Sequence, residues 1–152
     1  MTERRPLSFK EYRAMNANER DTGMVLQNLA TKVLPKDPDH IAPDGSEIRL
    51  LPDLAGGGLC HCTLPAGKTT QAVKHKTVEE IWCFIDGKGE VWRKRGNHEE
   101  VVAVEAGVSL TIPADTLFQF RNNGSEPLRF IIATMPPWPG PDEAVPVEGR
   151  WK

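Results

Sequence analysis

The chain has few cysteines, no long apolar run and almost no net charge. Its three cysteines are too few and odd in number to indicate a disulfide framework, and they are typical of a reducing cytoplasm. No stretch approaches the roughly 20 apolar residues of a membrane-spanning helix, and the N-terminal residues lack the apolar segment of a secretory signal. The formal net charge of −2 gives no general attraction to nucleic acid or an anionic membrane. We therefore predict a cytoplasmic protein that binds neither.

The length and the distribution of turn residues predict one domain with an extension at each end. A chain of 152 residues usually closes around a single hydrophobic core. Residues 1–45 are expected to form an N-terminal extension, a short helix over 8–20 followed by a loop rich in proline and aspartate. Ser8 and Glu11 have the spacing of a capping box at the start of that helix. The core domain is expected over 46–135 and a proline-rich tail over 136–152.

From residue 46 onward the sequence is a succession of short strand candidates separated by turn residues. Strands at this regular spacing, with no helix between them, predict an all-β sandwich or barrel. The predicted strands are Glu47–Leu51, Gly58–Leu64, Thr70–Val73, Glu80–Ile85, Glu90–Arg93, Glu99–Val104, Val108–Ile112, Leu117–Asn122 and Leu128–Met135.

The tail over 136–152 contains several prolines, which cannot donate to a central sheet ladder. Trp138 and Trp151 favour a docked, extended tail that packs on its own domain or on a dimer mate. A second interpretation is that the tail is a ligand for an aromatic groove of another protein.

Two segments of the core region, 75–87 and 107–122, carry turn and polar residues at a recognisable spacing. The matching positions are His75, Glu80, Gly87, Gly107, Pro113 and Asn122. With this spacing the pair resembles the two motifs of the cupin superfamily. The resemblance implies a cupin double-stranded β-helix, or jelly-roll barrel, and by family habit a homodimer.

The same resemblance places metal ligands in those relatives that bind a metal, two histidines and a glutamate from the first motif and a histidine from the second. Mapped onto this chain, these positions fall on Val73, His75, Glu80 and Phe118. A glycine of the second motif falls on Asp115. Only His75 and Glu80 can ligate a metal, and catalytic sites usually have at least three protein ligands. We expect no cofactor, with a divalent Zn, Fe, Mn or Ni ion on His75 and Glu80 as the alternative, its shell completed by water or a bound ligand.

His75 and Glu80 can also act without a metal. Glu80 is expected to orient His75 and raise its basicity, which would provide a general base for enolisation, epimerisation or dehydration. A buried polar pair with no chemistry is the alternative. Side chains of matching strand parity are expected to line the same cavity and contact a ligand; they are Trp82, Phe84, Phe118, Phe120 and Asn122.

These observations predict a protein that binds a small organic molecule, of sugar or carboxylic acid type, inside its barrel. The alternative is an enzyme, either a metal-dependent oxygenase or a His–Glu isomerase, epimerase or lyase. The number of activities that share such a fold prevents a more specific prediction.

Cys60 and Cys62 flank His61 and raise the question of a zinc site. On a strand, the two cysteines share one face and His61 lies on the other. Because no second ligand pair is present, we interpret the cysteines as buried apolar side chains.

Overall fold

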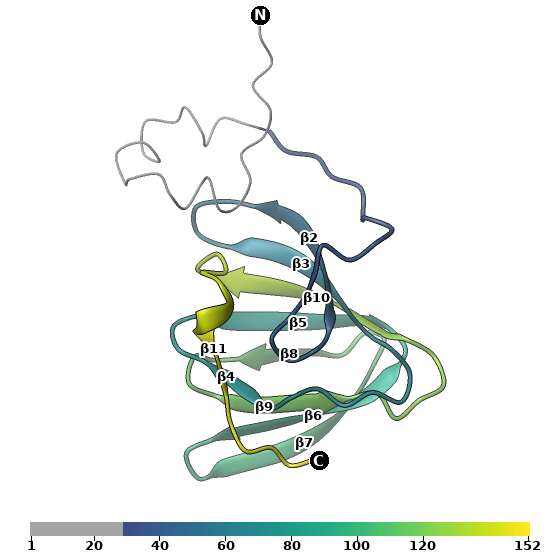
Figure 1. Cartoon of the computed structure of the whole chain (residues 1–152), viewed down its shortest axis with the longest axis vertical. Helices are drawn as coiled ribbons and strands as arrows, with labels where there is room; N and C mark the ends of the chain where they lie inside the picture. The colour runs from purple at the N-terminus through teal and green to yellow at the C-terminus, as the bar shows by residue number, and fades with distance from the viewer. Residues whose placement is uncertain (1–28) are drawn as a thin grey trace, which may run out of the picture.

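The computed structural model describes residues 29–152, which form two facing antiparallel β-sheets (Figure 1). The first sheet has six strands in the order β1 (His40–Ile41), β2 (Glu47–Asp53), β3 (Gly58–Leu64), β10 (Leu128–Met135), β5 (Glu79–Asp86) and β8 (Ser109–Ile112). The second sheet has five strands in the order β11 (Ala144–Pro146), β4 (Val73–His75), β9 (Leu117–Arg121), β6 (Lys88–Arg95) and β7 (His98–Glu105). A short 3₁₀ helix, η1 (Pro141–Glu143), precedes β11. The predicted all-β class is therefore confirmed.

Most predicted strands occur within a few residues of their expected bounds, whereas one is displaced. β4 begins at Val73 and not at Thr70, because Thr70 is held separately against β9. Its backbone N–H and its hydroxyl both donate to the carbonyl of Phe120. β1 and β11 are additional strands, and the helix predicted over 8–20 lies outside the described residues.

The alternation of buried and exposed residues in β5 and β10 explains why the sheets face each other. In β10 every second residue is buried, and in β5 the buried residues Glu80, Trp82 and Phe84 alternate with exposed ones. This pattern is expected when one face of a sheet packs on a core and the other does not. The two strands are neighbours, with Trp82 opposite Ile132 and Phe84 opposite Phe130. Together they present large apolar side chains to the five-stranded sheet.

A cluster of aromatic rings fills the centre of the space between the sheets. Neighbouring rings in the cluster have centroids between 4.6 and 6.3 Å apart, distances at which aromatic pairs attract one another. None is more than 2% exposed, so the cluster is a packed core. Its members are Trp82, Phe84, Phe118, Phe120 and Phe130.

Two turn positions show how the local sequence permits the fold. Gly87 joins β5 to β6 with φ of 84°, and a Cβ there would collide with the carbonyl of Pro127, so only glycine fits. Asp115, which occupies a glycine position of the second motif, also has a positive φ of 64°. Aspartate tolerates this left-handed conformation better than most residues, which explains how the turn persists without glycine.

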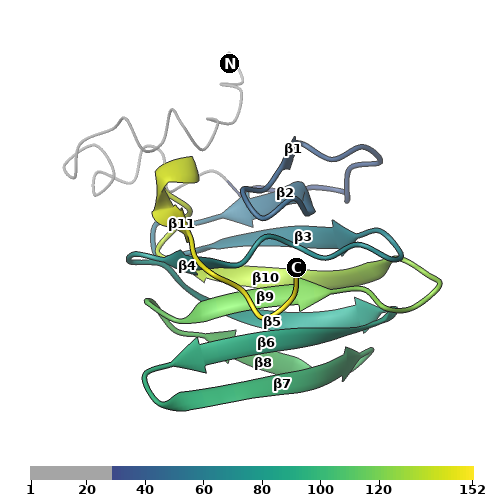
Figure 2. The same ribbon diagram turned by 60° about the horizontal axis from the view of Figure 1, so that its bottom comes forward.

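The proline-rich tail packs along the five-stranded sheet of its own chain (Figure 2). β11 is an edge strand paired with β4, as its proline requires. Further along, the side-chain amide of Gln119 forms hydrogen bonds of 2.9 Å with both the N–H and the carbonyl of Trp151. Arg121 lies 4.4 Å from the centre of the Trp151 ring.

Candidate functional site

The structure brings His75 and Glu80 together at one end of the space between the sheets. His75 ends β4 and Glu80 is the second residue of β5, and the two side chains are 5–6% exposed. The His75 Nδ1 atom lies 3.9 Å from Glu80 Oε1, which is too long for a hydrogen bond. The pair is therefore in contact without being bonded.

Glu80 is held in an almost apolar environment. Its Oε1 atom accepts a hydrogen bond of 3.0 Å from the indole N–H of Trp82, and its neighbours across the ladders are Thr134 and Ile112. Burial raises the pKa of Glu80 to about 8, although the Trp82 hydrogen bond acts in the opposite direction and the charge of Asp44 adds to the rise. At neutral pH the Glu80 side chain is therefore mainly the uncharged carboxylic acid.

His75 is enclosed by aromatic rings. Its ring centroid is 5.0 Å from Phe118 and 4.8 Å from Trp138, both in edge-to-face geometry. Burial lowers the pKa of His75 to about 4, and the Glu143 carboxylate only partly opposes that shift. Its Nδ1 atom has no hydrogen-bond partner among the described residues, so His75 is a neutral imidazole with one unused polar atom.

The expectation that Glu80 raises the basicity of His75 is wrong for this geometry. No hydrogen bond joins the two side chains, and a protonated Glu80 carries no charge that would stabilise an imidazolium. Burial raises the pKa of Glu80 and lowers that of His75, so that at pH 7 the acid is protonated and the imidazole is not.

The other predicted ligand-contacting residues divide into two groups. Phe118 and Trp82 touch His75 and Glu80, respectively. Phe84 and Phe120 contact rings of the core cluster. Asn122 is occupied by its loop, since its amide donates to the carbonyls of Leu64 and Glu126 and accepts from the N–H of Gly124.

The residues around the pair do not fit a divalent metal ion. Val73 and Phe118, at two of the ligand positions that the resemblance implies, are apolar, buried and opposite each other across β4 and β9. Within residues 29–152 no group of three or more His, Cys, Asp or Glu side chains is close enough to hold a metal. One imidazole and one protonated acid fall short of the usual three ligands.

The predicted separation of Cys60, Cys62 and His61 agrees with the structure. Cys62 belongs to the core at 1% exposure, whereas His61 lies on the opposite, outer face of β3. Burial raises the pKa of Cys60 to about 12, and the nearby Glu80 and Asp44 add to the rise, so its thiolate form is disfavoured. A zinc site requires thiolates, whereas here Cys62 is a buried thiol of the core and Cys60 is a half-buried thiol packed against it.

Two acidic residues close to the pair were not identified from sequence. The Glu143 carboxylate accepts hydrogen bonds from the backbone of Thr77 and Val78. Although burial acts to raise the pKa of Glu143, these bonds outweigh it and hold that pKa below its ordinary value. Asp44 accepts from Ser46, and burial raises its pKa despite those bonds.

Trp138 and Glu143 reach the site from the tail, a long-range contact that no local pattern in the sequence indicates. Asp44, followed by glycine and serine, gave only a turn signal.

Comparisons with known proteins agree on the fold. The family model of the cupin domain matches residues 60–134. An uncharacterized protein from Methanocaldococcus jannaschii is 29% identical over 126 residues, which cover 77% of this chain and 98% of the relative.

Solved structures extend the likeness to the arrangement of strands. A predicted oxalate decarboxylase from Thermotoga maritima superposes with a TM-score of 0.57 at 18% identity, over 68% of this chain and 98% of its own. The Streptomyces protein PAC13, solved with uridine, gives a TM-score of 0.60 at 11% identity, over 79% and 93%. At these identities the likeness concerns the fold alone. Within residues 29–152 no helix has the length and hydrophobicity that crossing a membrane requires.

Proposed function

Because the family model of the cupin domain matches residues 60–134, we propose that the chain is a cupin that binds a small organic molecule of sugar or carboxylic acid type beside His75 and Glu80. The observation that carries the proposal is the buried, unpartnered Nδ1 atom of His75, 3.9 Å from a carboxyl group. Buried polar atoms usually have a partner, and perturbed acid–base pairs are concentrated at functional sites.

The chemistry of the pair suits an oxygen-rich ligand. A protonated Glu80 offers an O–H donor, and the neutral His75 offers either a donor or an acceptor at Nδ1. Both groups can therefore bond to a carbonyl, carboxyl or hydroxyl oxygen without a charge being buried alone. The surrounding rings of Phe118, Trp82 and Trp138 supply the apolar lining typical of small-molecule sites.

Entry to this site is expected at the end of the sheets where the tail lies. The aromatic cluster fills the centre of the space between the sheets, whereas Trp138 packs against His75 from outside that cluster. Movement of Trp138 would open the pair to a ligand. The binding site therefore includes a residue of the tail.

An enzymatic function is the second candidate, and the opposite pKa shifts of the pair favour it. With Glu80 as general acid and His75 as general base, the site has the two roles that isomerases, epimerases and lyases need. The metal-dependent oxygenase has less support, because the donor set contains only two ligands. The absence of a cofactor stays a prediction.

A homodimer in the cytoplasm remains our proposal for the assembled protein. Apolar side chains on the outer face of the six-stranded sheet are 39–49% exposed at Leu59, Ile81 and Ile85, which gives a second copy an apolar surface to cover. Sedimentation of the full chain tests this, and a monomer at all concentrations would contradict it. We expect no nucleic acid or membrane partner.

The binding proposal is tested with a panel of short-chain carboxylic acids and free sugars, observed through the indole resonance of Trp82. We expect saturable shifts with at least one probe, reduced about tenfold in affinity by His75→Gln and by Glu80→Gln, as the loss of one good hydrogen bond implies. His98→Gln and Glu79→Gln are matched controls, because both side chains are exposed. Unchanged affinity in both site variants would contradict the proposal.

A further inference from the structure

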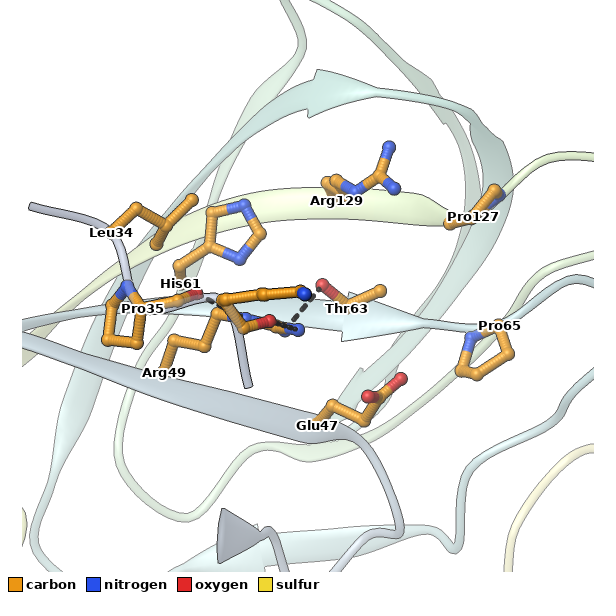
Figure 3. A pocket seen from close by; sticks show the side chains of 10 residues that line it. Leu34, Pro35, Glu47, Arg49, His61, Thr63, Pro65, Pro127 and Arg129 are labelled. Atoms are coloured by element: carbon orange, nitrogen blue, oxygen red, sulfur yellow. Dashed lines mark hydrogen bonds between the residues drawn. The ribbon is translucent and has the colours of Figure 1, made fainter. Parts of the chain in front are cut away.

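A groove with a volume of about 450 Å³ lies on the outer face of the six-stranded sheet (Figure 3). Its floor is formed by β2, β3 and β10, and one wall is the extended segment 34–36. Because side chains alternate along β3, the groove receives His61 while Cys62 enters the core. This outer groove is therefore separated from the His75–Glu80 pair by the sheet itself.

The groove contains more cationic than anionic side chains. Lys36, Arg49 and Arg129 line it together with a single carboxylate, Glu47. Arg49 donates to the carbonyls of Pro35 and Lys36, and it forms no ion pair with a carboxylate among the described residues. Its charge is consequently fixed in place without being neutralised.

Arg129 and His61 complete the polar part of the groove. Arg129 uses one nitrogen in a 2.9 Å ion pair with Asp86, and within residues 29–152 its other nitrogens form no further hydrogen bond. His61 is 6% exposed, and its buried Nδ1 atom has no partner among the residues described. An unpartnered buried polar atom beside two arginines indicates a site for a ligand that carries negative charge.

We propose that the outer groove binds a small organic anion, a carboxylate or a phosphate monoester, whose charged group is received by Arg49, His61 and Arg129. The apolar part of the anion packs on Leu34, Pro35 and Pro127, which line the same groove. Glu47 is the one carboxylate among the described residues that line the groove. Its charge disfavours a ligand that carries a second negative group. This site does not depend on the function proposed for the interior pair.

Binding of the anion is coupled to protonation of His61. Burial lowers the pKa of His61, and the positive charges of Arg49 and Arg129 lower it further. The other charged groups that face it are Lys36 and Glu47, with Asp86 behind Arg129. An anion offsets the arginine charges and favours the imidazolium, so the affinity increases as the pH falls through the pKa of His61.

The test uses inorganic phosphate, phenyl phosphate and benzoate as probes at constant ionic strength, with the full chain. NMR of the His61 ring and calorimetry are the two measurements. We expect one-to-one binding of phenyl phosphate or benzoate, an upward shift of the His61 pKa on saturation, and about tenfold weaker binding in Arg129→Gln. The organic probe that binds more tightly identifies the ligand class, and inorganic phosphate shows whether the charge alone is sufficient.

Matched variants separate specific binding from a general effect of salt. Arg95→Gln removes an exposed arginine outside the groove and should leave affinity unchanged, whereas Asp86→Asn should strengthen binding because it releases Arg129. His75→Gln should have no effect, which distinguishes this site from the interior one. Failure of both organic probes to shift the His61 ring, or equal affinity in wild type, Arg129→Gln and His61→Gln, would overturn the proposal.

Discussion

Two histidines, His75 between the sheets and His61 in the outer groove, are equally buried but surrounded by opposite chemistry. Both side chains are 5–6% exposed and both have an unpartnered Nδ1 atom among the described residues. Burial lowers the pKa of both. His75, however, contacts aromatic rings and a protonated acid, whereas His61 lies beside two arginines. Burial thus lowers the pKa of both histidines, whereas the neighbouring side chains determine which ligand each histidine can bind.

The largest contrast between the two regions is expected in packing energy. Phe118→Ala removes a ring that is 2% exposed and should reduce the free energy of unfolding by about 3–5 kcal/mol. Leu34→Ala, in the outer groove at 46% exposure, should reduce it by under about 1 kcal/mol. Urea denaturation of both variants measures the difference. Similar losses would mean that the groove wall is as much part of the core as the interior rings.

A second contrast concerns how stability depends on pH. Burial raises the pKa of Glu80 from 4.5 to about 8. The contribution of Glu80 to the free energy of unfolding is therefore fully present below about pH 4.5 and is lost as the pH rises to about 8. Glu80→Gln keeps an acceptor for the Trp82 indole but does not titrate. Between pH 4.5 and 8, its free energy of unfolding should therefore rise relative to that of wild type by on the order of 2–4 kcal/mol. Chemical denaturation at several pH values measures it.

The control for this experiment is Glu79→Gln, an exposed neighbour on the same strand. Its stability difference from wild type should not change with pH. A Glu80→Gln difference that is constant between pH 4.5 and 8 would mean that the carboxyl group is ionised in the folded protein.

Loosening the tail should affect His75 and leave His61 unchanged. Glu143→Gln weakens the charge-assisted bonds to Thr77 and Val78 and should cost about 1–2 kcal/mol. Glu143→Gln also removes the charge that partly raises the pKa of His75, so that pKa should fall further below its ordinary value. Glu148→Gln, exposed in the same tail, is the control. Equal pKa changes at both histidines, measured by NMR, would refute a local effect of the tail.

The smallest expected effect is on the titration of the two rings in wild-type protein. Saturating phenyl phosphate should raise the pKa of His61 while leaving that of His75 at about 4, since the sheet separates them. NMR titration of both rings with and without phenyl phosphate measures the two pKa values, and a shift at both rings would mean that the two sites communicate.

The lowered pKa of His75 also affects stability. Because that pKa lies below its ordinary value of 6.5, the contribution of His75 to the free energy of unfolding is lost as the pH falls from about 6.5 to 4.

Much of the fold was readable from local patterns. The turn residues, including Gly87, predicted where strands end. The alternation in β5 and β10 predicted that one face of each strand is buried and the other is not. These strand and turn features depend on neighbours in sequence, which is why pattern and parity suffice for them. The resemblance to the cupin motifs, and not parity, implied a common site for His75 and Glu80, whose side chains lie 3.9 Å apart.

The remainder depended on contacts between distant segments. Trp138 meets His75 only because the tail folds back along β4, and nothing near either residue indicates that contact. Parity predicted that His61 points away from the cysteine face, but the groove exists because Arg49 holds the carbonyls of the segment 35–36. The missing hydrogen bond between His75 and Glu80 reflects a separation that residue spacing does not determine.

The two hydrogen bonds between Gln119 and Trp151 involve the backbone of Trp151 and not its side chain. The amide of Gln119 bonds to the N–H and the carbonyl of Trp151 as a neighbouring strand would. Tolerance to substitution should therefore be asymmetric. Many residues at position 151 retain both bonds and lose only the contact with Arg121, worth about 0.5–1 kcal/mol, whereas position 119 requires an amide of the right length.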